Sequence, residues 1–130
     1  MIAAGSYLKL ERDWVAGNTL SFSLPMALSV TKYTGLTVIP GHERYAVEFG
    51  PILLCAVGGE WNRTIDSMLI RGVKTPGAPE TWLRPLAPGG AGIGAAASEM
   101  RFGVVGTPGV SFVSYFEVQE EVFEVYPAFA

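Results

Sequence analysis

The hydrophobic positions of the chain are arranged around one uninterrupted apolar run. Residues 49–57 read Phe-Gly-Pro-Ile-Leu-Leu-Cys-Ala-Val, and Gly58-Gly59 follows the run. A short apolar run bounded by turn residues is typical of a strand that is buried on both faces. We therefore expect the central strand of the fold here. Because Gly50-Pro51 interrupts the alternation and Pro51 lacks a backbone donor, it should bend or bulge the chain.

Polar and apolar residues alternate through most of the remaining chain. Leu8 and Leu10 share one face of residues 6–12, and every even-numbered residue from 20 to 30 is apolar. A period of two is the pattern of a half-buried strand, so both segments are predicted to be strands, with Pro25 at an edge, a bulge or a bend. Shorter alternating segments predict further strands at residues 44–49, 67–71, 99–105, 110–118 and 122–126.

A stretch rich in proline and glycine separates two groups of these segments. Residues 74–97 contain Pro76, Pro79, Pro85 and Pro88 together with five glycines. This composition predicts a long surface loop and argues against a helix or a central strand. We expect Trp82 and Leu83 to hold the loop against the rest of the protein.

Composition supports an all-β fold in one domain. The chain has 130 residues, of which 49% are hydrophobic and 16% charged, and its 16 glycines and 9 prolines divide it into short pieces. That length suits a single domain over residues 1–130, and no amphipathic helix of ten residues is visible. Seven to nine short strands predict a two-sheet antiparallel β-sandwich of jelly-roll or immunoglobulin-like outline. A closed β-barrel is the alternative.

The charge pattern argues against two classes of partner. The net charge is −3, and the nine Lys and Arg residues are scattered, so no basic stripe predicts binding to nucleic acid. No apolar stretch reaches the eighteen residues of a membrane-spanning helix, so no membrane partner is expected. A single cysteine excludes an internal disulfide but leaves the compartment open.

Few residues here suit catalysis, metal binding or a cofactor. Cys55 lies inside the apolar run, where a cysteine behaves as a small hydrophobic residue. His42 is the only histidine and is expected in a solvated turn; with one cysteine it cannot complete a structural zinc site. The acidic residues near the C-terminus are expected to form a solvated face: Glu117, Glu120, Glu121 and Glu124. We therefore expect no catalytic residue, no metal and no cofactor.

The tryptophans are the strongest candidates for a binding surface. Trp14, Trp61 and Trp82 fall in predicted loops, where an exposed aromatic ring can bind a sugar or dock a neighbouring domain. The alternative is that these rings plug the ends of the sandwich.

Several segments resemble one family. Residues 7–14 (Tyr-Leu-Lys-Leu-Glu-Arg-Asp-Trp), 17–20 (Gly-Asn-Thr-Leu), 24–26 (Leu-Pro-Met) and 49–56 (Phe-Gly-Pro-Ile-Leu-Leu-Cys-Ala) follow one another as in the C-terminal β-sandwich region of glycoside hydrolase family 127. This family is the β-L-arabinofuranosidase-like group, formerly a family of unknown function. Residues 115–118 and 123–127 look like the closing strands of the same region.

The resemblance implies an accessory role. The family's catalytic machinery, a zinc-bound cysteine with further cysteine ligands and a glutamate, lies in a preceding (α/α) helical barrel, and nothing in this chain matches that barrel. Cys55 corresponds to a sandwich strand, so no catalytic residue is carried over and the chain is not expected to be an enzyme. The resemblance predicts a non-catalytic domain that packs against the barrel or another subunit. A carbohydrate-binding module using the loop tryptophans is the alternative, and an enzyme with a site around His42 is a third hypothesis.

Overall fold

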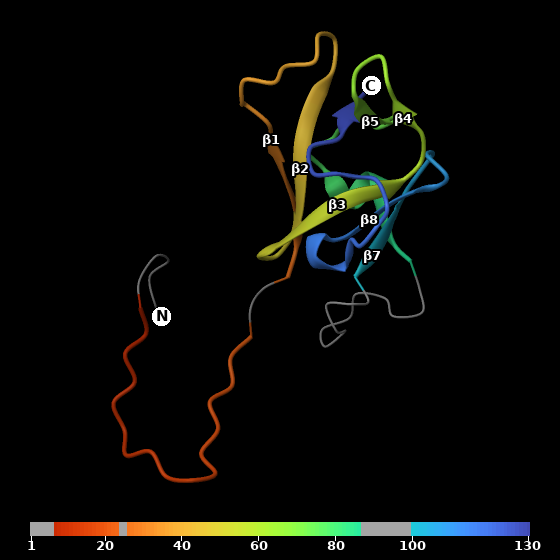
Figure 1. Ribbon diagram of the computed structural model, residues 1–130. Helices are drawn as coiled ribbons and strands as arrows, with labels where there is room; N and C mark the ends of the chain where they lie inside the picture. The colour runs from red at the N-terminus through yellow and green to blue at the C-terminus, as the bar shows by residue number, and fades with distance from the viewer. Residues whose placement is uncertain (1–6, 24–25, 87–99) are drawn as a thin grey trace.

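The computed structural model describes residues 7–23, 26–86 and 100–130, and within these ranges the protein is nearly all β. Ten strands belong to one hydrogen-bonded sheet that is not closed into a barrel. The only helices in the described ranges are a four-residue α-helix and a three-residue 3-10 helix (Figure 1). The predicted all-β class is confirmed, and the closed barrel is not formed.

The elements follow the chain closely, with short connections. The strands of the first half are β1 (Leu28–Lys32), β2 (Glu43–Phe49), β3 (Ile52–Gly58), β4 (Trp61–Asn62) and β5 (Ser67–Ile70). The second half contains α1 (Pro79–Trp82), β6 (Leu83–Pro85), β7 (Arg101–Val104), β8 (Val110–Ser114), η2 (Tyr115–Glu117), β9 (Phe123–Glu124) and β10 (Ala128–Phe129).

The predicted central strand is β3. It pairs with β2, β8 and β9, all antiparallel, and its residues 54–57 are buried. Phe49 lies opposite Ile52, so Gly50-Pro51 forms a two-residue hairpin loop. Gly50 has a φ of 57°, a conformation that glycine adopts without steric cost and that a two-residue hairpin of this kind requires at its first loop position. The expected bend at Gly50-Pro51 is therefore a tight turn.

The sheet curls into a sandwich-like arrangement around one core. In the order β4-β5-β10-β2-β3-β8-β7-β6, strands β2 and β7 are three places apart, which in a flat sheet would separate them by about 14 Å. Nevertheless, the rings of Phe49 on β2 and Phe102 on β7 are 5.4 Å apart. The strands thus fold over so that side chains from distant parts of the sheet meet. Among the described strands, every pair is antiparallel except β5 with β10, which is parallel.

Part of the predicted loop at residues 74–97 is ordered secondary structure. Pro79 begins α1, where its missing N–H costs nothing because the first turn of a helix leaves that donor unpaired. β6 follows at the end of the strand order and contains Pro85, consistent with the restriction of proline to edge strands. The prediction of no helix was wrong for four residues, whereas Trp82 and Leu83 are buried as expected. Residues 87–97 lie outside the described ranges.

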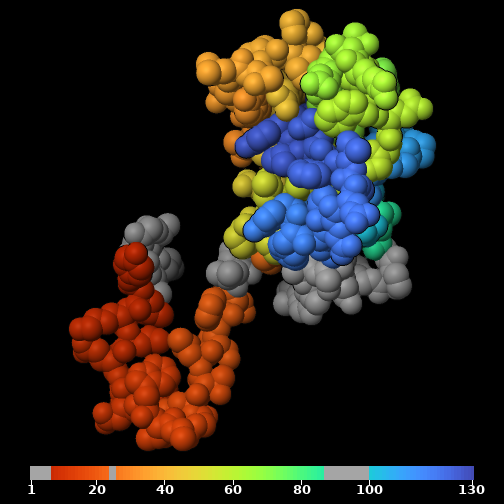
Figure 2. All heavy atoms as spheres, viewed as in Figure 1, coloured from red at the N-terminus to blue at the C-terminus, as the bar shows by residue number. Residues whose placement is uncertain are grey.

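The N-terminal third departs most from the sequence-based prediction. Of the strands expected over residues 6–12 and 20–30, only β1 forms within the described residues. Residues 7–23, here called the N-terminal arm, are all exposed, and Figures 1 and 2 show the arm standing away from the rest of the protein, here called the body. The alternation of polar and apolar residues indicates only that a segment could form a half-buried strand. A strand also needs a neighbour with which to pair, and no described segment supplies one.

The C-terminal segments are shorter than predicted, and one strand was missed. β8 ends at Ser114, where the chain enters η2, and the strand expected at residues 122–126 is reduced to β9. β10 was not expected. It pairs with β5 and β2 and carries the buried side chain of Phe129.

Candidate functional site

The three tryptophans lie in three different environments. Trp14 is on the arm with 51% of its surface exposed, and the guanidinium of Arg12 lies 5.0 Å from its ring centre. Trp61 begins β4 and is 37% exposed, whereas Trp82 in α1 is 4% exposed. The structure therefore does not gather them into one surface.

Trp82 is a core residue. Its ring packs edge-on against Phe112 at 5.9 Å and Phe129 at 5.4 Å. Its indole Nε1 donates a hydrogen bond to the carbonyl oxygen of Pro76 at 3.1 Å. Because both its apolar surface and its polar atom are satisfied inside the protein, the ring offers no open face to a ligand in this structure.

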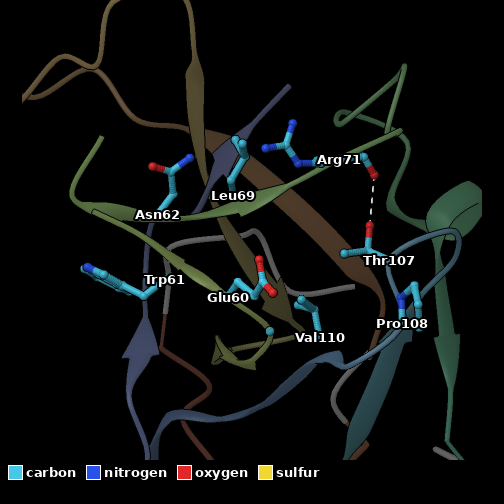
Figure 3. Close-up of a pocket in the computed structure, with 9 residues that line it drawn as sticks. Glu60, Trp61, Asn62, Leu69, Arg71, Thr107, Pro108 and Val110 are labelled. Atoms are coloured by element: carbon cyan, nitrogen blue, oxygen red, sulfur yellow. Dashed lines mark hydrogen bonds between the residues drawn. The ribbon is translucent and has the colours of Figure 1, made fainter. Parts of the chain in front are cut away.

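Trp61 lies beside a pocket of about 340 Å³ at the β4–β5 end of the sheet. This volume is at the lower end of the range of small-molecule sites. The pocket is formed by the turn before β4, by β5, and by the turn that leads into β8 (Figure 3). Its lining residues are Gly59, Glu60, Trp61, Asn62, Leu69, Arg71, Thr107, Pro108 and Val110.

The polar groups of this pocket carry opposite charges. Among the described residues, neither Glu60 nor Arg71 has an ion-pair partner. Thr107 Oγ1 donates to the carbonyl oxygen of Arg71 at 2.9 Å, which fixes the two turns together. In Figure 3 the indole of Trp61 points away from Glu60 and Arg71. The pocket thus offers a carboxylate and a guanidinium, with the aromatic ring at its rim.

Cys55 is placed as predicted, in the core. Its exposed fraction is 1%, and burial raises the pKa of the thiol, with the nearby charge of Glu124 as a smaller cause in the same direction. A nucleophilic cysteine needs a lowered pKa and access to solvent, and Cys55 has neither.

The surroundings of His42 contain one carboxylate among the described residues. A surface hollow of about 430 Å³ is lined by His42 and neighbouring residues, and Glu43 is its only carboxylate. Hydrogen bonds from Lys32, and next from Tyr45, lower the pKa of Glu43, so this carboxyl group is held ionised rather than ready to donate a proton. Among the described residues, no three His, Cys, Asp or Glu side chains cluster as a metal site would require.

Sequence reasoning missed a largely buried ion pair. Glu124, expected on a solvated acidic face, lies 3.3 Å from Arg44 Nη2, and the two side chains are 12% and 13% exposed. Ser67 Oγ donates to Glu124 Oε2 at 3.1 Å, and Arg44 Nε donates to the carbonyl oxygen of Tyr126 at 2.8 Å. The partners are 80 residues apart in the sequence, so no local pattern could reveal the pair. It joins β2, β5 and β9 inside the body.

The arm exposes more large apolar side chains than any other segment of the described chain. Phe22 is 77% exposed, and more than a third of the surface of each of the other large apolar side chains is open. These side chains are Tyr7, Leu8, Leu10, Trp14, Val15 and Leu20. A soluble monomer rarely exposes so many apolar groups on one segment. The arm is therefore the strongest candidate for an interaction surface.

Comparisons with protein-family models, curated proteins and solved structures find no match for this chain. The resemblance to family 127 therefore stays a prediction from the residues quoted above. Within the described residues, no helix has the length and apolar character needed to cross a membrane.

Proposed function

We propose that this chain is a non-catalytic accessory β-sandwich domain of a carbohydrate-active enzyme, which packs through its arm against a helical catalytic barrel or another subunit. The exposed arm is the observation that carries the proposal. The family resemblance supplies the class of enzyme, and the burial of Cys55 is consistent with a domain that performs no chemistry of its own.

The energetics of the arm favour docking. Fully burying a side chain such as Leu20 or Phe22 contributes about 1.5–3 kcal/mol. The arm carries seven large apolar side chains that the body leaves exposed. Ordering an extended segment costs roughly 1–2 kcal/mol per residue, so the arm gains little from a fixed shape until a partner covers it.

Two measurements test this role. Deleting residues 1–23 should leave the midpoint and cooperativity of body unfolding unchanged, because the arm contributes nothing to the core. A loss of several kcal/mol in the free energy of unfolding would show that the arm belongs to the body, and would contradict the docking role.

The second measurement addresses catalysis. The purified chain should release no product from a panel of aryl glycosides that includes the β-L-arabinofuranoside. Hydrolysis that disappears in His42→Ala would instead support the enzyme hypothesis. Loss of activity in that variant is informative only if its circular dichroism matches the wild type.

The pocket beside Trp61 favours a second candidate function, the binding of carbohydrate. Glu60 and Arg71 provide an acceptor and donors for hydroxyl groups, and Trp61 places an apolar ring at the rim. Plant cell-wall oligosaccharides should then quench tryptophan fluorescence in the wild type and in Trp14→Ala, but not in Trp61→Ala. If no oligosaccharide of a broad panel quenches the tryptophan fluorescence of the wild type, carbohydrate binding at this pocket is excluded.

A further inference from the structure

Residues 19–23 of the arm form a two-faced segment just before β1. Leu20 and Phe22 are 55% and 77% exposed, and small polar residues occupy the positions between and beside them: Thr19, Ser21 and Ser23. The apolar positions are in phase with Leu28 and Val30 of β1, which pack against the core. The segment therefore has the side-chain pattern of a strand whose apolar face is left uncovered.

The backbone of this segment has no partner in the described chain. The arm's one backbone–backbone hydrogen bond within the described residues is in a turn, from Asn18 N to Val15 O. β2, the neighbour of β1, ends at Phe49, and Gly50 N then donates to Ala27 O as the chain turns back into β3. Residues 19–23 precede Ala27 in the chain and have no paired residue in β2. Free donors and acceptors along an extended segment are a template for pairing with another strand.

We propose that residues 19–23 pair with the same residues of a second copy of this chain, as antiparallel strands related by a two-fold axis at Ser21. This inference rests on the proposed docking role of the arm. It specifies that the partner of the arm is a second copy of the same chain.

The segment's own sequence favours this partner. With the axis at Ser21, Leu20 lies opposite Phe22 in both halves, and Thr19 lies opposite Ser23. Opposed residues of an antiparallel pair point to the same face, so one face of the ribbon is entirely apolar and the other entirely polar. A shift of register by one residue would mix the faces. A two-fold arrangement also closes on itself and limits assembly to a dimer.

The other described sheet ends suit an incoming strand less well. β6 has three residues and contains Pro85, which cannot donate a hydrogen bond. β4 has two residues. The five residues of the arm segment match the usual length of a strand. Among the described strands, β1 is as long and pairs only with β2, but its apolar residues Leu28 and Val30 already pack against the core, whereas Leu20 and Phe22 are exposed.

Light scattering coupled to size-exclusion chromatography tests the dimer. The wild type should have twice the 13.9 kDa mass of one chain. Phe22→Asp should be monomeric, because it removes the cross-strand contacts between Phe22 and Leu20 and places a charge on the apolar face of the ribbon. Ser23→Asp is the matched control: it adds the same charge to the polar face of the same segment and should remain dimeric.

Cross-linking tests the register. Ser21→Cys places two thiols directly opposite each other at a separation that a disulfide can span, whereas Ser29→Cys places them far from the axis. Because Cys55 is buried, mild oxidation should yield a covalent dimer of Ser21→Cys and leave Ser29→Cys uncross-linked. A monomeric wild type, or a dimer that survives Phe22→Asp and fails to cross-link at position 21, overturns the proposal.

The two proposals can fail separately. A monomeric wild type whose body is unaffected by deletion of residues 1–23 would remove the second copy as partner and leave the docking role intact. A deletion that unfolds the body would remove the docking role itself.

Discussion

At the scale of single residues, glycines fix the two ends of the central strand. Gly50 forms the turn that opens β3, and Gly58 ends it with a φ of 74°. A Cβ atom at Gly58 would overlap the carbonyl oxygen of Gly109. Gly72 has nearly the same backbone angle, a φ of 78°, but a Cβ atom there would meet nothing within 4 Å. The two positions separate the cost of the backbone angle from the cost of close contact.

Substitution of these glycines by alanine measures that difference. Gly72→Ala should lower the free energy of unfolding by about 1–2 kcal/mol, the cost of the left-handed conformation for a residue with a side chain. Gly58→Ala should lose about 1–3 kcal/mol more, because the backbone must also move. Urea denaturation of both variants checks the order, and equal losses would mean that the contact with Gly109 is relieved without cost.

At the scale of elements, the buried Arg44–Glu124 pair links strands that are distant in the sequence. β9 has only two residues, yet Glu124 contacts Arg44 of β2 and Ser67 of β5. A short strand contributes few backbone hydrogen bonds, so these side-chain contacts hold it in place. The exposed pair of Lys32 and Glu43 offers a natural comparison, because each of its side chains is 54% exposed.

Removing one partner of each pair should have unequal effects. Glu124→Ala leaves the Arg44 guanidinium buried without its counter-charge and should cost about 3–5 kcal/mol. Glu43→Ala should cost far less than Glu124→Ala, because solvent replaces an exposed pair. Chemical denaturation compares the two variants. A small loss in Glu124→Ala would indicate that water reaches Arg44 when the carboxylate is absent.

At the scale of the whole molecule, the chain divides into a packed body and an exposed arm. The core is drawn from most strands of the body, from Val47 of β2 to Phe129 of β10. The arm contributes none of the buried residues. Stability should therefore differ sharply between the two parts, since local opening follows the number of buried apolar contacts.

Limited digestion with trypsin reports this division. The first cuts should follow Lys9 or Arg12, because an extended exposed segment fits a protease without unfolding. The body should persist after the arm is cut, and mass spectrometry identifies the sites. First cleavage within β2, at Arg44, would contradict the division.

Much of the fold follows from local pattern. The apolar run at residues 52–57 and its flanking glycines predict β3, and the alternation at residues 44–49 predicts β2, because burial and turn formation there depend on neighbouring residues. The burial of Cys55 and the attachment of Trp82 and Leu83 to the body also follow from local pattern, whereas the expectation that Trp82 offers an exposed ring for binding is wrong. The pocket beside Trp61 could not be predicted from local pattern, because it brings residues 59–62 together with residues 107–110, which are distant in the sequence.

The sequence by itself determined the β class, the central strand and the turn that opens it, because side-chain period and turn residues act over a few positions. Only the tertiary structure decided which alternating segments became strands. The clearest alternation in the chain runs through residues 20–30, yet within the described residues only β1 is paired there. A strand depends on a neighbour that supplies hydrogen bonds and covers its apolar face, and that neighbour is set by the folded arrangement of the whole chain and its partners.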